Sequence, residues 1–229
     1  MELPWVYQDT ALAQIGREQP LSLYLANSAS PRRVGIEAFI GERFAVQHQA
    51  RIRHFMPCLL SLEDSTGQLL GAVGLRSAGN GPLFLERYLQ QPAEQVIATK
   101  KVAHAPQRMQ LVEVGNLAAS SPGAARLLIV ALTDLLVALG YRWVTFTGTL
   151  ALLNSFQRLG LTPVALGPAN PDCLGDEQTD WGTYYDNQPQ VMAGDIYAGH
   201  QRLLQLGAYP RLAHQAFYAL EDMPNVACR

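Results

Sequence analysis

The sequence predicts an α/β (α+β) fold in which helices flank a mixed central sheet. Two strand-like runs at 58–62 and 69–75 enclose a turn and therefore indicate a β-hairpin. Beyond residue 110, apolar strand-like runs alternate with helical patterns as far as residue 166, which is typical of a sheet covered by helices. The 229 residues are 48% hydrophobic and 16% charged, so the chain can bury a sizeable core.

The first half of the chain contains short elements separated by turn residues. We expect a strand at 21–25, a helix at 34–49, the two hairpin strands, and short helices at 83–89 and 93–98. Apolar residues recur at helical spacing between 34 and 49, with charged residues on the opposite side, which predicts an amphipathic helix.

The stretch 111–161 is the unit around which the rest of the chain is organised. A strand is expected at 111–117, and Gly115 within it indicates a bulge. Because side chains of a strand alternate between its two faces, Glu113 shares a face with Leu111.

A strongly apolar helix is expected at 123–139. Ser121 can act as its N-cap, Pro122 suits its first position, and Gly140 suits its C-terminal end. This helix is apolar on nearly every side, so we expect it to be buried. The following elements are predicted as a strand at 142–147, a helix at 150–159 and a strand at 163–166.

The composition changes after Gly167. Residues 168–182 are rich in Pro, Asp and Gly and are predicted as a loop. Residues 191–206 are compatible with strand or helix, and the helical pattern is clearer from Asp195 onward. We therefore predict two parts, a core at 1–170 and a C-terminal extension at 171–229 that packs on the core.

Charge and composition exclude several classes of protein. The net charge of −2 gives no broad electrostatic footprint for nucleic acid. The N-terminus lacks the basic and apolar regions of a signal peptide, and the longest apolar run, 127–139, is too short to span a bilayer. Three widely spaced cysteines indicate free thiols in a reducing compartment. We therefore expect a cytoplasmic protein. The sequence does not determine its oligomeric state.

Glu113 is the first candidate for chemistry. A carboxylate in an apolar strand is costly to bury unless it is paired or hydrogen-bonded, and burial raises its pKa. Such a group suits a base that accepts a proton from an attacking amine. The alternatives are a structural ion pair, for instance with Arg126 or Arg142, or a position facing solvent.

The loop at 120–126 is the second candidate. The first amides of a helix lack partners within the helix and carry partial positive charge, so they attract anions such as a pyrophosphate. The small side chains in this loop leave those amides accessible. The alternative is an ordinary capped helix packed against the sheet. The five histidines show no metal-ligand spacing, and no Gly-x-Ser-x-Gly motif is present, so we expect no metal and no hydrolase of that type.

The order of elements and two motifs resemble the acyl-CoA N-acyltransferase (GNAT-like) superfamily over about residues 21–166. Residues 121–126 (SPGAAR) stand where that superfamily has its pyrophosphate loop, and Ser120 replaces the usual leading Gln or Arg. Residues 156–161 (FQRLGL) match a segment whose tyrosine often serves as general acid to the leaving thiolate, and here that position is Phe156. The resemblance implies a coenzyme A or phosphopantetheine thioester as donor.

Four segments are similar to the thermostable hemolysin family: 82–89 (PLFLERYL), 112–118 (VEVGNLA), 181–186 (WGTYYD) and 193–195 (AGD). The same positions are more remotely similar to acyl-homoserine lactone synthases, which use acyl carrier protein thioesters and S-adenosylmethionine. Glu113 is the counterpart of a strand Glu in those enzymes. Asn116 stands where they have Arg, so their substrate set does not transfer to this chain.

The resemblance implies an N-acyltransferase that moves an acyl group from coenzyme A or an acyl carrier protein to a small amine or amino-acid-derived acceptor. Glu113 and Asn116 are the expected catalytic residues, the latter at a bulge whose backbone amide polarises the carbonyl. The thioester is expected to contact Leu117, Ala118, Ser120, Ser121, Gly123, Ala124, Ala125 and Arg126. The expected walls of the substrate pocket are Phe84, Trp181, Tyr184 and Tyr185.

Two other functions remain open at this point. One is a non-catalytic protein on the same fold that is membrane-active, as the hemolysin name implies, or binds acyl lipids. The replacement at Phe156 and the altered loop at 120–126 favour this alternative. The other is an interaction module without a ligand.

Overall fold

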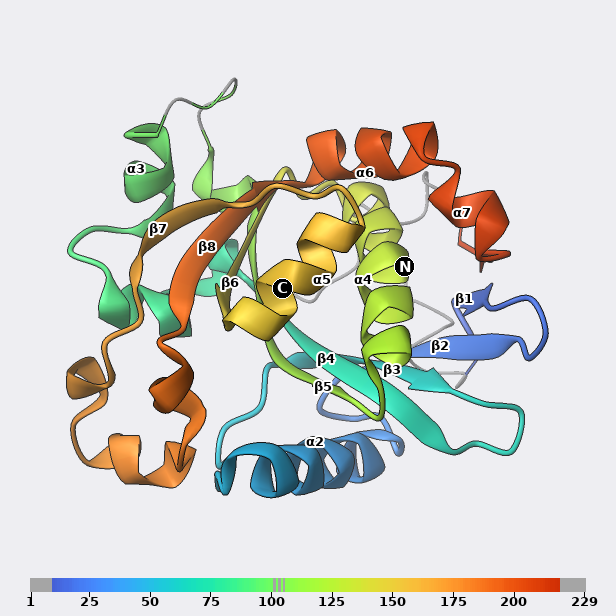
Figure 1. The fold of residues 1–229 in the computed structure, drawn as a ribbon, viewed down its shortest axis with the longest axis horizontal. Helices are drawn as coiled ribbons and strands as arrows, with labels where there is room; N and C mark the ends of the chain where they lie inside the picture. The colour runs from blue at the N-terminus through green and yellow to red at the C-terminus, as the bar shows by residue number, and fades with distance from the viewer. Residues whose placement is uncertain (1–9, 101, 103, 105, 219–229) are drawn as a thin grey trace.

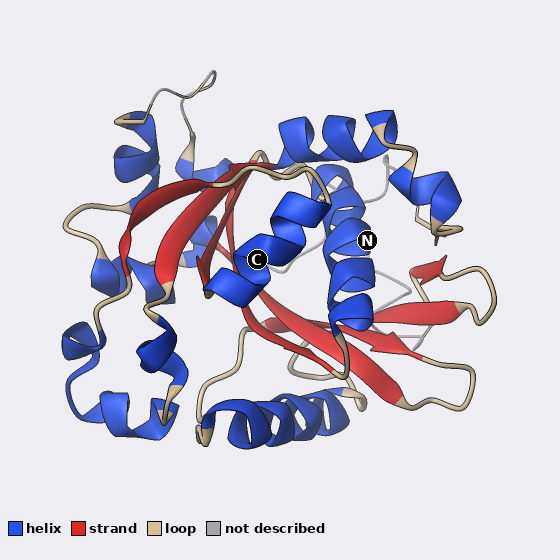
Figure 2. Ribbon diagram, in the orientation of Figure 1, coloured by secondary structure: helices blue, strands red, loops and turns tan. Residues whose placement is uncertain are grey.

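A mixed β-sheet forms the centre of the molecule, with helices on both faces (Figure 1; Figure 2). The computed structural model describes residues 10–100, 102, 104 and 106–218. The strands in this part of the chain are β1 (Ala13–Ile15), β2 (Leu21–Ala26), β3 (Cys58–Glu63), β4 (Leu69–Ser77), β5 (Leu111–Ala119), β6 (Trp143–Gly148), β7 (Val164–Pro168), β8 (Gln190–Asp195) and β9 (Gln215–Ala216). The order across the sheet is β7-β8-β6-β5-β4-β3-β2-β1-β9.

The helices cover the sheet and its edges. The α-helices are α2 (Arg33–His48), α3 (Ala93–Ala98), α4 (Pro122–Ala138), α5 (Leu150–Arg158), α6 (Ile196–Gln205) and α7 (Ala208–Arg211). Short 3₁₀ helices are η1 (Ala78–Asn80), η2 (Phe84–Tyr88), η3 (Arg108–Gln110), η4 (Pro171–Trp181) and η5 (Tyr184–Asn187). The predicted mixed sheet flanked by helices is confirmed, and so are the predicted helices that became α2, α4 and α5.

The strands β5 and β6 form the parallel pair at the centre, and they separate part of the way along. Their pairing runs from Leu111 with Trp143 to Val114 with Phe146. β5 nevertheless continues to Ala119, where its other edge pairs with β4. The edge of β5 that faces β6 therefore has no ladder partner beyond Val114, and a gap opens in the sheet there.

A bulge in β5 lies at the start of this gap. Gly74 on β4 pairs with Gly115, but Ala72 pairs with Ala118, so β5 carries one residue more than β4 over this step. Asn116 has φ 51°, a left-handed value that Asn adopts more readily than most residues. The bulge predicted at Gly115 is thus present, one residue further along.

The bulge changes which face each side chain of β5 takes. Before it, Val112 packs in the core cluster of α4, while Leu111 packs on the opposite face with residues of η2 and α3. After it, Leu117 packs on the α4 side and Ala118 packs against α2. A single extra residue inverts the alternation, so both ends of β5 keep an apolar face toward a helix.

The buried helix α4 begins as its sequence predicts. The Ser121 hydroxyl accepts a hydrogen bond from the Ala124 amide at 3.1 Å, with Pro122 at the first helical position. Most of the helix is buried between the sheet and α6. Gly140, which follows the helix, has φ 77°, a conformation that glycine adopts at little cost.

The segment after residue 170 contributes to the interior of the sheet. β8 lies between β6 and β7 and pairs antiparallel with both. Residues 168–182, predicted as a loop, contain η4. The boundary between a core at 1–170 and an extension at 171–229 stays a prediction, and its last residues, 219–229, lie outside the described part of the chain.

Two expectations about the cellular setting can be compared with the structure. Within the described residues, none of the helices has the length and apolar character needed to cross a membrane. Cys173 is a free and exposed thiol. Cys58 is disulfide-bonded, so the expectation of free thiols was wrong for this residue, and the expected reducing compartment loses its support from the cysteines.

Candidate active site

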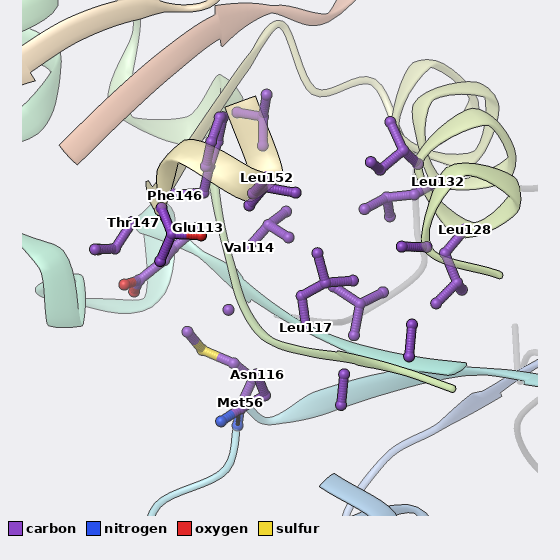
Figure 3. A pocket seen from close by; sticks show the side chains of 18 of the residues that line it. Met56, Glu113, Val114, Asn116, Leu117, Leu128, Leu132, Phe146, Thr147 and Leu152 are labelled. Carbon is purple, nitrogen blue, oxygen red and sulfur yellow. Dashed lines mark hydrogen bonds between the residues drawn. The ribbon is translucent and has the colours of Figure 1, made fainter. Parts of the chain in front are cut away.

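A cavity of about 1160 Å³ occupies the gap between β5 and β6. Its lining includes Glu113 and Phe84 on the side of η2, and Leu128 and Leu132 of α4 on the other side of β5. Figure 3 shows Glu113 on one side of the β5 ribbon and the leucines of α4 on the other. The cavity therefore reaches both faces of the sheet, which a continuous ladder would close.

Glu113 lies at the polar end of the cavity with 3% of its surface exposed. One carboxylate oxygen accepts a hydrogen bond from the Phe84 amide at 2.8 Å, and the other accepts one from the Leu85 amide at 2.9 Å. Burial raises the pKa of Glu113, and the two amide hydrogen bonds oppose this shift without cancelling it. Glu113 is thus a buried carboxyl group that keeps its proton to a higher pH than an exposed Glu does.

Two of the alternatives raised for Glu113, an ion pair with Arg142 and a position facing solvent, do not hold in the structure. Arg142 lies within 2.8 Å of Asp195, with which it forms an ion pair. Glu113 is buried, so the alternative of a solvent-facing position does not apply. Arg76, its direct neighbour on β4, shares its face, lines the cavity and lowers its pKa through its charge.

The amides that bind Glu113 are held in place by an ion-pair network that the sequence did not predict. Glu86 accepts hydrogen bonds from the amides of Leu83 and Ala93, both at 2.8 Å. Arg108 bonds to Glu86 and, at 2.8 Å, to Glu94. Burial alone would raise the pKa of Glu86, but the hydrogen bonds outweigh it and hold the pKa below its usual value. The hydrogen bonds and ion pairs of Glu86 therefore hold η2 in place next to the sheet.

Asn116 lines the cavity, but its side chain bonds to the loop before β3. Its Oδ1 accepts a hydrogen bond from the Met56 amide at 2.9 Å, and its Nδ2 donates to the His54 carbonyl at 3.4 Å. Figure 3 shows Met56 and Asn116 next to each other. These two hydrogen bonds give the Asn116 side chain a structural role, because they hold the loop before β3 against β5.

Two substitutions separate the role of the Asn116 side chain from that of its backbone. Asn116→Gly keeps the left-handed backbone and removes both side-chain hydrogen bonds, so we expect a stability loss of about 1–2 kcal/mol with near-normal turnover. Asn116→Ala adds backbone strain and costs about 1–2 kcal/mol more. Urea unfolding measures the stability loss, and steady-state kinetics measure turnover. A hundredfold loss of turnover in a stable Gly variant would make the side chain catalytic.

The start of α4 forms the rim of the cavity. Of the residues expected to contact the thioester, Leu117, Ala118, Ser120, Ser121 and Ala125 line the cavity. Gly123, Ala124 and Arg126 are not among the lining residues. The Ala124 amide is already bonded to Ser121, so the amide of Gly123, a residue just outside the cavity lining, is the remaining donor of the first turn.

Aromatic side chains form one wall of the cavity. All four predicted pocket residues line the cavity: Phe84, Trp181, Tyr184 and Tyr185. Phe44 and His48 of α2 extend this group, since Phe44 packs edge-on against Trp181 at 6.4 Å between ring centroids and His48 against Tyr184 at 5.2 Å. Burial raises the pKa of Tyr185 to about 12, so this hydroxyl stays protonated at neutral pH.

The segment carrying these rings is attached to the end of α2 by backbone hydrogen bonds. The Thr183 amide donates to the His48 carbonyl at 2.8 Å, and the Arg51 amide donates to the Asp180 carbonyl. Gly182 has φ 52°, and a Cβ at this position would lie 2.1 Å from the His48 oxygen. Only glycine therefore permits this close approach, which brings Trp181 and Tyr184 to the cavity.

Two further features concern the expected general acid and possible metal ligands. Phe156 of α5 stacks on Phe146 with ring centroids 5.0 Å apart, so the position expected for a general acid carries no hydroxyl. Among the described residues, no group of three His, Cys, Asp or Glu side chains is placed to hold a metal ion.

Comparisons with known proteins find one matching family model and solved structures with the same fold. The family model described as thermostable hemolysin matches residues 26–200. No curated protein matches the chain by sequence. The solved structures that share the fold include the three described next, and each of them is similar to this chain over most of its own length.

The acyl-homoserine lactone synthase LasI is 13% identical, with a TM-score of 0.56, and covers 81% of this chain and 95% of its own. The CoA-dependent acyl-homoserine lactone synthase BjaI, solved with SAM and isopentyl-CoA, is 13% identical with a TM-score of 0.55, covering 88% and 90%. FeeM, an N-acyl amino acid synthase from uncultured soil microbes, is 14% identical with a TM-score of 0.54, covering 81% and 96%. At these identities the likeness is one of fold.

Proposed function

We propose that this chain, which belongs to the thermostable hemolysin family, transfers an acyl group from a thioester to an amine. One observation carries the proposal: a buried carboxyl, Glu113, borders a cavity that passes through the sheet where β5 and β6 separate. Proteins of the same fold include acyl-homoserine lactone and N-acyl amino acid synthases, which supports the reaction class.

The donor in this proposal is a thioester of coenzyme A or of an acyl carrier protein. Its phosphate groups lie at the first turn of α4, where the Gly123 amide and the helix dipole favour an anion. The pantetheine arm follows the edge of β5 that has no ladder partner beyond Val114. A backbone amide near the bulge at Asn116 then polarises the thioester carbonyl.

The proposed reaction is the aminolysis of a thioester. The amine nitrogen attacks the carbonyl carbon, a C–N bond forms, and the C–S bond breaks. Glu113 accepts the proton that the amine loses, directly or through a water molecule. The products are an amide and a thiol. A thiol with a pKa near 8.5 leaves readily as a thiolate, so Phe156 in the acid position does not prevent the reaction.

The acceptor is a small amine or an amino-acid-derived amine that enters on the Glu113 side of the sheet. Trp181, Tyr184 and Tyr185 provide a wall for its apolar part. The guanidinium of Arg76, next to Glu113 on the same face, favours an acceptor that also carries a negative group.

The direct test is release of free thiol from an acyl-CoA supplied with a panel of amines and amino acids. We expect thiol release that depends on both substrates. A second candidate, a membrane-active or acyl-lipid-binding protein without catalysis, is favoured by Phe156 and by the two amides that already occupy Glu113. Leakage of liposomes without thiol release from any donor would support that candidate and end the enzyme proposal.

A charge change at the rim tests where the donor binds. Ala125→Glu places a carboxylate on the first turns of α4, so we expect the KM for acyl-CoA to rise about tenfold at low salt, because two negative groups repel. Ala125→Gln has the same size without the charge and is expected to change KM less than threefold. Steady-state thiol release measures both. Equal effects of Glu and Gln would place the phosphates elsewhere.

A further inference from the structure

The half of the cavity on the α4 side of the sheet is lined mainly by apolar side chains. We call it the acyl lobe. Its walls are Leu117 of β5, Leu128, Leu132 and Leu136 of α4, and Leu152 and Phe156 of α5. Figure 3 shows Val114, Leu117, Leu128, Leu132 and Leu152 around one common space. Thr133 also lines it, but its hydroxyl donates to the Ile129 carbonyl at 2.8 Å and is therefore satisfied.

The acyl lobe is long in comparison with an acetyl group. From Leu128 to Leu136 its lining follows α4, and eight residues of helix span roughly 12 Å. A saturated chain advances roughly 1.3 Å per carbon, given C–C bonds of about 1.5 Å. The lobe therefore accommodates a tail of about nine carbons beyond the reacting group.

The far end of the acyl lobe reaches the surface between α5 and α6. Gly160, at the end of α5, and Gly199, on α6, both line the cavity there. Ala198 and Arg202, also lining residues, are exposed. A Cβ on Gly199 would lie 3.4 Å from the side chain of Leu161, another lining residue, so a larger side chain at this position would extend toward the exit.

We infer that the donor carries a fatty acyl chain of about eight carbons or more. Its thioester lies in the gap near Glu113, and its tail runs between α4 and α5 toward the exit at Gly199. An acetyl group would leave the lobe either empty or filled with water that has few polar partners along the leucine walls, and apolar cavities bind apolar ligands instead. This inference rests on the proposed function for the identity of the donor.

A chain-length series of acyl-CoAs tests the inference by binding alone, without an acceptor. Each buried methylene is expected to strengthen binding roughly fourfold. The Kd should fall steeply from acetyl to about decanoyl and then level off, because later carbons leave through the exit. Equal affinity for acetyl-CoA and decanoyl-CoA would overturn the inference. The same series on acyl carrier protein distinguishes the two sources of the thioester.

A variant pair locates the tail. Gly199→Phe fills the exit, so we expect the ratio of affinities for dodecanoyl-CoA over hexanoyl-CoA to fall at least tenfold. Leu204→Phe places the same ring on α6 at a position that is 47% exposed and does not line the cavity, and it should keep the wild-type ratio. An unchanged ratio in a folded Gly199→Phe protein would remove the tail from this exit. If that variant fails to fold, the wild-type series still decides the inference.

The outcomes separate this inference from the proposed function. Steep chain-length dependence without thiol release from any amine would keep the acyl lobe and end the acyltransferase proposal. Thiol release with no preference beyond acetyl would keep the acyltransferase and end the inference. A parallel series of free fatty acids completes the set, because binding as tight as that of the acyl-CoAs would show that the lobe does not require a thioester and so contradict a donor site.

Discussion

Glu113→Gln lowers kcat/KM for thiol release by a factor of about 10²–10⁴, because the amide cannot accept the proton of the attacking amine. The substitution preserves the shape of a side chain that is buried and bonded to two amides of η2. One of those amides then faces an NH₂ group, so we also expect a stability loss of about 1–3 kcal/mol. Steady-state kinetics and urea unfolding measure the two effects separately.

The pH dependence of activity distinguishes a catalytic base from a structural carboxylate. Burial raises the pKa of Glu113, and only the deprotonated form accepts a proton, so activity should fall as the pH drops through that raised pKa. The stability contribution has the opposite sign: a raised folded pKa favours folding below the unfolded pKa, and this contribution is lost as the pH rises through the folded pKa. The acid limb of the activity profile should disappear in the Gln variant.

Glu63 provides a matched control for Glu113→Gln. It is another buried carboxylate of the sheet, bonded to the Ser61 hydroxyl and to Arg32, and it does not line the cavity. Glu63→Gln should cost stability and leave the pH profile of turnover intact. A Glu113→Gln enzyme with the turnover of wild type would remove Glu113 from its catalytic role and leave it as the anchor of η2.

Gly182→Ala destabilises the folded protein by more than about 3 kcal/mol, because two effects add. The backbone at Gly182 (φ 52°, ψ −125°) lies in a region that only glycine tolerates well. A methyl group there would also approach the His48 carbonyl to 2.1 Å, so the segment that carries Trp181 and Tyr184 has to move away from α2. We expect a lower Tm and weaker binding of the acceptor amine.

Gly175→Ala isolates the contribution of the backbone conformation. Gly175 has nearly the same conformation (φ 58°, ψ −134°), and a Cβ there meets nothing within 4 Å. Its substitution should cost about 1–3 kcal/mol and leave the aromatic wall in place. Equal Tm values for the two alanine variants would mean that the contact with His48 relaxes at little cost and does not hold the wall.

The sequence predicted those elements whose signals are local. The N-cap, the proline and the closing glycine set the limits of α4, and the alternation of β5 placed Glu113 on the face of Leu111. The position of β8 was not predictable in this way, because its neighbours in the sheet come from residues 143–148 and 164–168, and pairing between distant segments leaves no local pattern.

The same distinction applies to the candidate site. Glu113 and the four aromatic residues could be singled out because their types are unusual in their segments or belong to family motifs. Phe44 and His48 lie in an amphipathic helix whose pattern looks ordinary, and only the fold brings them to Trp181 and Tyr184. The two amides of η2 that bind Glu113 carry no sequence signal, because every residue except proline has such an amide.

The place of β8 between β6 and β7 has a consequence for the order of folding. During synthesis, the central parallel pair is complete once residue 148 has been made, but the outer edge of β6 remains open until residue 195 appears. An unpaired edge next to an apolar core invites association with other chains, and pairings of this kind form slowly. The nascent chain therefore passes through a stage in which Glu113 and most of the residues that line the cavity have been made while the sheet still lacks β8. A chaperone that prevents aggregation would act with the greatest effect at this stage.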